Sequence, residues 1–154
     1  MAPSDIGDLA GELAQVSGWG ITQDTDTQIS SLLRAVNQTI LDNVECQNEF
    51  GFGIWVYDTV VCLNGKTYQG GCNVSLSKEV KKIRESIKIS IAILNCICRE
   101  IVVVCLVVWR DNEPVLVGSV SYGSAKGCEQ RYPSAFTRIS SYADWIKNIT
   151  QIEF

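Results

Sequence analysis

Short apolar runs separated by turn-forming residues occupy most of the chain, a pattern typical of antiparallel strands. The clearest run is residues 33–40, in which apolar and polar positions follow a period of two, as expected of a half-buried strand. The other strands that we expect cover residues 13–20, 59–62, 106–109, 114–122 and 134–139. The run Asp111-Asn112-Glu113 between two of these strands predicts a hairpin.

Two segments follow a helical pattern instead. Residues 42–48 are expected to form a helical turn with Asn43 as its N-cap. From residue 140 onward, apolar residues recur at the spacing of one helix face, namely Tyr142, Trp145, Ile146 and Ile149. The cap of this second helix is expected to be Ser140 or Ser141. The aromatic residues expected in the core are Trp19, Phe136 and Trp145. The whole pattern predicts an all-β fold, a six-stranded antiparallel barrel with a C-terminal helix over residues 140–150.

Residues 74–105 depart from this pattern, because they contain neither glycine nor proline and are rich in isoleucine and lysine. The basic residues of the segment are Lys78, Lys81, Lys82, Arg84, Lys88 and Arg99. Residues 87–109 have the hydropathy of a membrane span, but Lys88, Arg99 and Glu100 interrupt them, and the apolar runs stay below the roughly 18 residues that a span requires. We therefore expect no membrane helix, although a marginal membrane-active helix is an alternative.

Composition narrows the functional classes further. A length of 154 residues, with 46% apolar and 19% charged residues, is that of one folded domain. The net charge of −4 argues against a non-specific nucleic-acid binder, which needs a basic surface. The chain has no histidine, so it cannot by itself form a Ser-His-Asp triad or an imidazole metal site. Cys96, Cys98 and Cys105 are one ligand short of structural zinc, and we expect no metal and no cofactor.

The cysteine count and the N-terminal sequence favour different cellular compartments. Seven cysteines are many for a cytosolic protein and odd in number, which favours oxidised pairs with some left over. The start, Met1-Ala2-Pro3-Ser4-Asp5, has neither the basic nor the apolar stretch of a secretory signal peptide. Either the cysteines stay reduced in the cytosol or the N-terminus is missing, and we favour the second alternative.

Several motifs resemble the C-terminal half of chymotrypsin-like serine endopeptidases, above all the insect and crustacean digestive type. They are Val16-Ser17-Gly18-Trp19-Gly20, Gly71-Cys72-Asn73, Val120-Ser121-Tyr122-Gly123, Gly127-Cys128 and Tyr132-Pro133-Ser134-Ala135-Phe136-Thr137-Arg138, with Cys46 and Cys62. Their order and spacing agree over residues 13–73 and 106–149. The resemblance implies a partial peptidase domain over residues 1–154. Its parts are the second of the family's two barrels (residues 13–73 and 106–139), a foreign insertion (residues 74–105) and the terminal helix (residues 140–150).

The resemblance also implies roles for particular residues. It pairs Cys46 with Cys62 and Cys72 with Cys128 in disulfides. It places six residues around the primary specificity pocket: Gly70, Gly71, Ser121, Tyr122, Gly123 and Ser134. Trypsins carry an aspartate at the pocket base where this chain has Gly70, so an uncharged pocket for apolar or small side chains is implied. Residues 121–123 would offer a strand edge to the substrate backbone. The alternative is that these glycines are turn residues without a binding role.

By the same resemblance, no catalytic residue is expected in this chain. The family's first barrel, which carries the catalytic histidine and aspartate, is absent, and the nucleophile motif Gly-Asp-Ser-Gly-Gly-Pro does not follow Asn73. Leu76 stands where the serine belongs. Ser75 and Ser77 lie beside it, but neither has the flanking glycines that form the turn and the oxyanion donors.

The genetic code suggests an origin for the insertion. Val74-Ser75 can be encoded by GTAAGT, the consensus start of an intron. Residues 99–104 can be encoded by AGGGAGATAGTGGTGGTC; after its leading AG, a typical intron end, the shifted frame encodes Gly-Asp-Ser-Gly-Gly and the first base of a proline codon. We therefore interpret residues 74–98 as translated intron and residues 99–104 as the nucleophile exon read out of frame. A second frame change near Cys105 would restore the family sequence at Leu106.

The sequence thus predicts a fragment of a serine-type endopeptidase, a hydrolase that cleaves peptide bonds after apolar residues, inactive in this form. The alternatives are a non-catalytic homologue that binds peptides or protein partners, and an unfolded product, because half a double barrel exposes an apolar face. The resemblance implies an extracellular protein with peptide or protein substrates, no nucleic-acid or membrane partner, and the missing first barrel as its intramolecular partner. Three glycosylation sequons, usable only in a secreted chain, begin at Asn37, Asn73 and Asn148.

Overall fold

The computed structural model describes residues 4, 6–21, 23–25, 28, 30–51, 55–66, 105–124, 126 and 129–152, and the structural findings concern these residues. Their elements in chain order are β1 (Leu13–Gly18), β2 (Arg34–Leu41), α1 (Asn43–Phe50), β3 (Val60–Leu63), β4 (Cys105–Arg110), β5 (Glu113–Tyr122), β6 (Ser134–Arg138), the 3-10 helix η1 (Ile139–Tyr142) and α4 (Ala143–Thr150).

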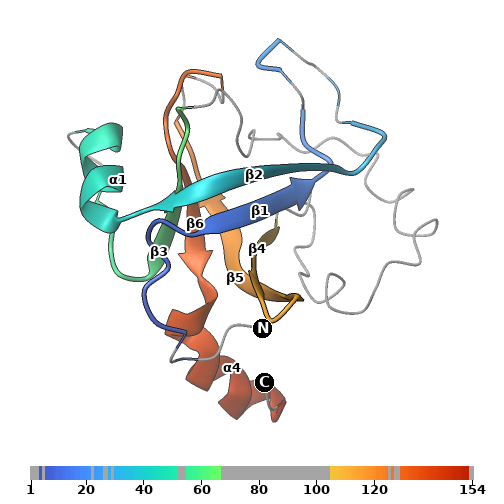
Figure 1. Ribbon diagram of the computed structural model, residues 1–154, viewed down its shortest axis with the longest axis vertical. Coiled ribbons are helices and arrows are strands. Elements are labelled where there is room, and N and C mark those ends of the chain that lie inside the picture. Colours follow the sequence, from blue (N-terminus) through green and yellow to red (C-terminus); the bar gives the residue numbers. More distant parts are fainter. Residues whose placement is uncertain are drawn as a thin grey trace.

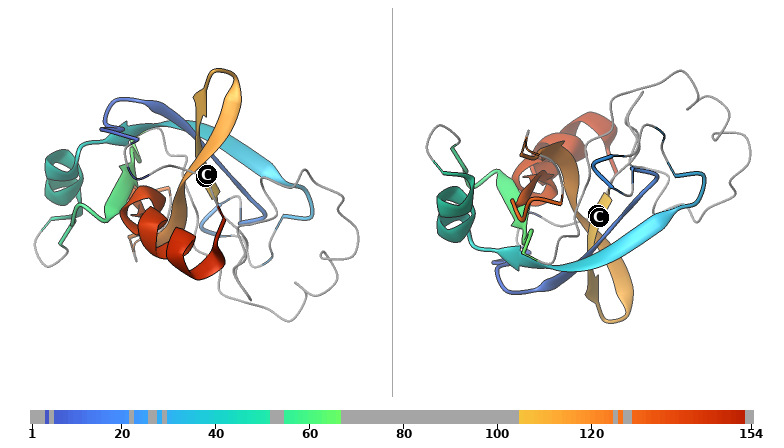
Figure 2. Two further views of the ribbon diagram at one scale, coloured as in Figure 1. Left: turned by 90° about the horizontal axis from the view of Figure 1, so that it is seen from below. Right: turned by 90° about the horizontal axis from the view of Figure 1, so that it is seen from above.

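The six strands form a closed antiparallel barrel in the order β1-β2-β3-β6-β5-β4 (Figure 1). β1 closes it, because Val16 pairs with Val36 of β2 on one side and with Leu106 of β4 on the other. Closure leaves no long strand edge exposed to aggregation. Both helices lie outside the barrel, α1 beside the end of β2 and α4 below the strands (Figures 1 and 2). The predicted barrel with a C-terminal helix is confirmed.

The barrel interior is filled by the inward-facing side chains of all six strands. Its core is formed by Leu9, Ala14, Val16, Ile40, Val61, Leu63, Leu106, Val108, Val117 and Phe136. Phe136 is fully buried, as the sequence predicts. Gly118 gives Phe136 its space: a Cβ atom there would lie 3.0 Å from the Cβ atom of Phe136 and 3.1 Å from that of Leu106. A larger residue at this position would therefore force the core apart.

The β4–β5 hairpin turns on two residues. Asp111 and Asn112 both have positive φ angles, 50° and 65°, as a type I′ turn requires, and aspartate and asparagine are among the residues that tolerate them. Glu113, which the sequence pattern assigns to the turn, is already the first residue of β5 and pairs with Arg110. The predicted hairpin is confirmed, with a tighter turn than the three polar residues suggest.

The predicted helix caps are wrong at both helices. α1 is capped by Asp42, whose carboxylate accepts a hydrogen bond of 2.8 Å from the amide of Glu45. Asn43, the predicted cap, is the first helical residue and donates instead to the carbonyl oxygen of Tyr57. α4 has no side-chain cap, because η1 runs directly into it and places Tyr142 at the cap position.

The apolar face of α4 is only partly buried. Ala143 is buried and Ile146 half-buried, whereas Trp145 and Ile149 are 64% and 67% exposed. Trp145 is thus not a core residue, contrary to the sequence prediction, and Trp19 is half-buried. Periodicity identifies the apolar face of a helix, but it does not say whether that face meets its own barrel or another partner.

The predicted insertion lies almost entirely outside the described residues. Of residues 74–105, only Cys105 is described; it is buried and begins β4. The proposed insertion boundaries and its origin therefore stay predictions. Within the described part of the chain, no helix is long and apolar enough to span a membrane.

Candidate functional site

The end of β5 and the start of β6 bring four of the six predicted pocket residues together. Tyr122 pairs with Ala135, so that Ser134 lies next to the segment that ends with Tyr122 and Gly123. Ser121 is exposed, Tyr122 and Gly123 are half-buried, and Ser134 is buried. The other two predicted pocket residues, Gly70 and Gly71, lie outside the described residues. The pocket and the binding roles of all six residues stay predictions.

A β-bulge changes the course of β5 at this site. The register with β6 shifts between Val120, which faces Phe136, and Tyr122, which faces Ala135, so Ser121 has no partner residue on β6. On the other side of β5, pairing with β4 ends at Ser119 in the described part of the chain. Bulges occur next to binding sites because they end regular pairing and re-aim the backbone. This one leaves Ser121 outside the regular pairing, and Tyr122 pairs with β6 again.

Open space lies over Gly123. Apart from its own chain neighbours, a Cβ atom built on this residue would have no heavy atom of the described residues within 4 Å. An extended chain that pairs with a strand edge needs such unobstructed backbone, since its own main chain must approach within hydrogen-bond distance. The geometry at Gly123 can accommodate that approach.

The Tyr122 side chain has an apolar environment. Its ring contacts that of Phe50 at the end of α1, with centroids 5.5 Å apart and planes tilted by 44°. The Tyr122 hydroxyl is buried and, among the described residues, has no hydrogen-bond partner. Burial raises the pKa of this phenol, because the charged form loses its hydration. An unsatisfied buried hydroxyl is costly, and a ligand that offers a polar atom there would recover part of the cost.

A disulfide holds α1 and β3 together behind this site. Cys46 of α1 and Cys62 of β3 are bonded, with their Cα atoms 6.2 Å apart, which confirms the first predicted pair. Both cysteines are fully buried in a second apolar cluster with Leu41, Val60 and Ala135, against which Phe50 and Tyr122 pack. The disulfide therefore anchors the aromatic pair. The second predicted pair, Cys72 with Cys128, lies outside the described residues.

Polar contacts position the loops that border the site. The Lys126 ammonium group donates to the Tyr132 hydroxyl at 2.7 Å. Asp24 and Glu129 exchange two bonds, each carboxylate accepting from the other residue's amide at 2.7 and 3.2 Å. Gly65 lies so close to the Tyr132 backbone that a Cβ atom would fall 2.0 Å from its carbonyl oxygen. Only glycine fits at that crossing.

A three-residue ion cluster lies on the outer surface of α1. The Lys66 ammonium group lies 2.8 Å from a carboxylate oxygen of Glu45 and 2.8 Å from one of Glu49. The hydrogen bonds to Glu45 and Glu49 raise the pKa of Lys66. Lys66 and Glu45 are 55% and 43% exposed and Glu49 is partly buried, and ion pairs in such positions contribute little to stability.

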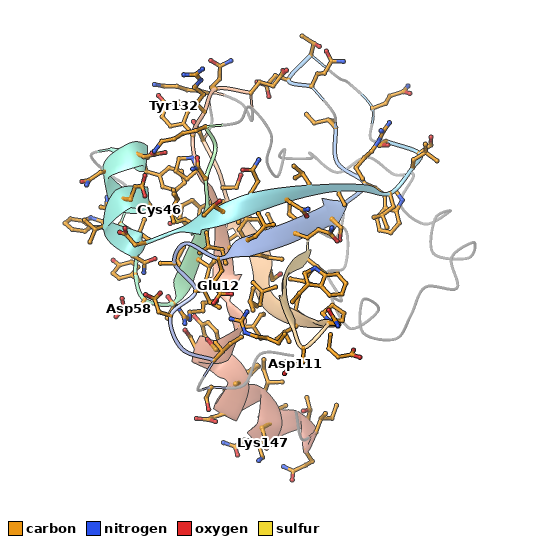
Figure 3. All side chains as sticks on the ribbon, viewed as in Figure 1. Glu12, Cys46, Asp58, Asp111, Tyr132 and Lys147 are labelled. Carbon is orange, nitrogen blue, oxygen red and sulfur yellow. A yellow bond between two sulfur atoms is a disulfide. The ribbon has the colours of Figure 1, made fainter. Side chains whose placement is uncertain are left out.

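The described residues offer no acid–base machinery at the β5–β6 site. They contain no group of three or more His, Cys, Asp and Glu residues that could hold a metal ion. Histidine is absent from the whole sequence. Figure 3 shows the labelled carboxylates Glu12, Asp58 and Asp111 on other parts of the barrel. What the described residues offer at this end is an irregular strand end with open space at Gly123.

A separate groove of about 620 Å³ lies elsewhere, between the N-terminal segment, α1 and η1. Arg138 holds one side of it, donating to the carbonyl oxygen of Gly7 and, at 2.9 Å, to the Ser140 hydroxyl. None of the predicted pocket residues lines the groove. We therefore assign the candidate site to the β5–β6 end.

Sequence reasoning missed two features of the site, namely Phe50 and the bulge at Ser121. Phe50 is the last residue of α1, and nothing in the sequence around it indicates that its ring contacts Tyr122 of the distant strand β5. A bulge is often marked by glycine, and Ser121 gives no such sign.

Comparison with known proteins agrees with the barrel and its motifs. The chain is 27% identical over 149 residues to brachyurin of Leptuca pugilator, a match that covers 97% of this chain and 50% of that protein. It is 33% identical over 144 residues to chymotrypsin of Phaedon cochleariae, covering 93% of this chain and 39% of that protein. A solved structure titled HL collagenase superposes with a TM-score of 0.63 at 25% identity, over 95% of this chain and 49% of that one.

No protein-family model matches the chain. The chain spans half or less of the length of these curated relatives. The matches nevertheless extend over nearly all of this chain. The barrel topology and the Cys46–Cys62 disulfide agree with the same family. The chain is a relative of the chymotrypsin-like serine proteases and corresponds to their C-terminal half.

Proposed function

We propose that this chain is the peptide-binding half of a serine-type endopeptidase and that it cannot cleave peptides in the form given. The observation that carries the proposal is the end of β5, where Ser121 leaves the ladder and Gly123 has open space above it. An extended peptide would pair with residues 121–123 by β-augmentation. Peptides and proteins are accordingly the proposed substrates, and neither nucleic acid nor a membrane is a proposed partner.

Inactivity follows from the missing groups. Acyl transfer by this family's chemistry needs a nucleophile, a base, an orienting acid and oxyanion donors. This chain has no histidine, and leucine stands at position 76, where the resemblance expects the serine. Loss of triad members costs several orders of magnitude in rate. Binding is therefore the activity that remains.

We further propose that the complete enzyme, with its nucleophile motif and first barrel present, cleaves after apolar residues. Gly70 stands at the pocket base where a trypsin would carry an aspartate, so no carboxylate is supplied there for an arginine or lysine side chain. The apolar environment of Tyr122 supports the same preference, because Phe50 and the disulfide cluster border it. Specificity would then come from burial of an apolar side chain.

The intramolecular partner that we propose is a preceding half-chain, folded as the family's first barrel. Four apolar residues at helical spacing form a stripe along and beyond α4, hereafter the α4 stripe: Tyr142, Trp145, Ile149 and Ile152. They are between 41% and 67% exposed. Covering one such side chain is worth about 1.5–3 kcal/mol. The chain spans half or less of the length of these relatives, which supports a partner from the same polypeptide.

For residues 74–104 we propose a retained intron followed by the nucleophile exon in the wrong frame. The support is that the motifs of the resemblance lie on both sides of this segment and that the barrel continues in β4 from Cys105 onward. Correct splicing would join Asn73 directly to Gly-Asp-Ser-Gly-Gly-Pro, restoring the serine and its oxyanion turn.

The proposed site of action is outside the cell. The support is the Cys46–Cys62 disulfide, since structural disulfides persist in oxidising compartments. The proposal also implies that the second pair, Cys72 with Cys128, forms in the complete protein.

The experiment uses the chain as given, in oxidised form. We expect no labelling by a fluorophosphonate probe and no hydrolysis of apolar peptide substrates, but saturable binding of an extended apolar tetrapeptide measured by NMR shift changes. Gly123→Val fills the open space and should abolish binding without unfolding the barrel, because nothing lies within 4 Å of the added Cβ atom. The matched control is Ala35→Val on the exposed surface of β2. Hydrolysis by the chain, or equal binding by the two variants, would contradict the proposal.

A second candidate function is a non-catalytic protease homologue that binds a protein partner. One relative supports it: the chain is 26% identical over 148 residues to glucanase inhibitor protein 3 of Phytophthora infestans, a protein named for inhibition and not for proteolysis. The mature transcript distinguishes the two candidate functions. For a non-catalytic homologue, it would still encode residues 74–104 or another sequence without the nucleophile motif.

A further inference from the structure

Two glycosylation sequons in the described part of the chain have no role in the proposed function. Asn37-Gln38-Thr39 lies on β2 and Asn148-Ile149-Thr150 on α4. An N-x-Thr sequence is only a potential acceptor, since it must also be accessible and compatible with the fold. The asparagine and threonine of both sequons are exposed, so the two sequons differ in their surroundings and not in accessibility.

The β2 sequon alternates between the two faces of the barrel wall. Asn37 and Thr39 are exposed on the outside, whereas Gln38 between them is 4% exposed and points inward. Both residues of the sequon that define the acceptor therefore face solvent without disturbing the core. A substituent at Asn37 would extend away from the barrel.

A cross-strand hydrogen bond orients Asn37. The Gln15 side chain on β1 donates from Nε2 to Oδ1 of Asn37 at 3.1 Å, and the two residues are direct partners in the ladder. The bond uses the oxygen of the Asn37 amide, not the nitrogen. An N-glycosylated asparagine keeps this oxygen and one N–H, so the modification would preserve the bond that holds the side chain in place.

We propose that Asn37 is an N-glycosylation site of this protein, an inference that rests on the proposed entry of the chain into the secretory pathway. The donor class is an oligosaccharide linked through a diphosphate to a lipid. A bond forms between Nδ2 of Asn37 and C1 of the first sugar, while the bond from C1 to the diphosphate oxygen breaks. The amide proton leaves as the lipid diphosphate is released.

The surroundings of Asn37 suit a sugar. Leu13, the partner of Thr39 on β1, is 62% exposed, and it lies two residues along the ladder from the Gln15–Asn37 pair. Diagonal neighbours across strands are about 7–8 Å apart. The first sugar would therefore lie close enough to shield this exposed leucine from water.

Asn148 lies in a different environment. It is on α4 one residue before Ile149 and three after Trp145, both of which belong to the α4 stripe. A glycan there would stand at the border of the surface that we assign to the partner half. The proposal therefore concerns Asn37 alone.

The test is translation of the full chain, fused to a cleavable signal peptide, in the presence of microsomal membranes. Only chains that have entered the microsomes are protected from added protease, and only these are analysed. The added signal peptide brings the chain into the microsomes, so the result does not depend on whether the natural protein is exported. We expect a gel shift that peptide-N-glycosidase reverses, with the glycan mapped to the Asn37 peptide by mass spectrometry. Asn37→Gln and Thr39→Ala should abolish that modification, whereas the conservative Thr39→Ser should retain it.

Compatibility with the fold is measured on the glycosylated product. It should form the Cys46–Cys62 disulfide and show the same urea midpoint as the enzymatically deglycosylated chain. Protected chains without a glycan on Asn37 would overturn the inference, and so would a glycosylated chain that cannot form the disulfide.

Discussion

The Cys46–Cys62 disulfide should supply a large share of the stability of this six-stranded barrel. The perturbation is the double variant Cys46→Ala/Cys62→Ala, which removes the cross-link between α1 and β3. The bond closes a loop with a sequence separation of 16 residues. The chain-entropy relation gives about 3 kcal/mol for a loop of that length at 25 °C.

Both sulfur atoms belong to fully buried residues, so their removal adds a small packing loss of about 1 kcal/mol. The expected decrease in the free energy of unfolding is therefore about 3–5 kcal/mol. With a urea m-value of about 1–3 kcal/mol/M, the midpoint should fall by at least about 1 M. The contact between Phe50 and Tyr122 should loosen as well, which near-ultraviolet circular dichroism would detect.

The assay is urea unfolding of the oxidised chain, followed by tryptophan fluorescence. Cys105→Ala is the matched control, because Cys105 is also a buried cysteine but lies outside this disulfide. Its cost should be about 1 kcal/mol. Equal midpoints for the double variant and the wild type, or an equal loss in Cys105→Ala, would refute the stabilising role of the cross-link.

Three further predictions concern single contacts. Asp42→Ala should cost about 0.5–2 kcal/mol because it removes the cap of α1, and more than Asn43→Ala if the cap is assigned correctly; urea midpoints compare them. Gly65→Ala should cost about 1–3 kcal/mol or more, since its Cβ atom would fall 2.0 Å from the Tyr132 carbonyl oxygen, and a thermal melt as stable as the wild type's would contradict this. Burial raises the pKa of Tyr122, so this proton is bound more tightly in the folded state; the resulting stability is present below the unfolded pKa near 10.0 and lost as the pH rises through the folded value. Tyr122→Phe should remove that alkaline loss, and an unchanged pH dependence of unfolding in this variant would show that another group is responsible.

The strands were predictable because a barrel imposes its pattern directly on the sequence. Alternation at a period of two identified β2, and glycine or polar runs marked most strand ends. The hairpin turn at Asp111-Asn112 was predictable for the same local reason, since few residue types accept two positive φ angles in succession.

The caps and the exposed α4 stripe were not predictable, for different physical reasons. Asp42 and Asn43 are both good cap residues, and only the path of the chain out of β2 decides between them. Trp145 lies on the apolar face of its helix, and the spacing of apolar residues identifies this face. The spacing does not show which surface covers the face, and Trp145 is in fact exposed.

The proximity of Tyr122 and Ser134 was predicted through motif resemblance rather than local pattern, and the β5–β6 pairing brings the two residues together. Their binding roles stay predictions. Phe50 reaches the same site only through the disulfide-linked packing of α1 on β3, which is a property of the folded chain. Long-range contacts of this kind leave no signal in a single sequence.

The most direct test of the central claim is the sequence of the mature transcript, from upstream of Met1 through the codons for Asn73 and Leu106. We expect Asn73 to be joined directly to Gly-Asp-Ser-Gly-Gly-Pro, and a histidine-bearing half-chain to be encoded upstream. A mature message that retains the codons for residues 74–104 and encodes no such half would contradict the claim that this chain is the peptide-binding half of an endopeptidase.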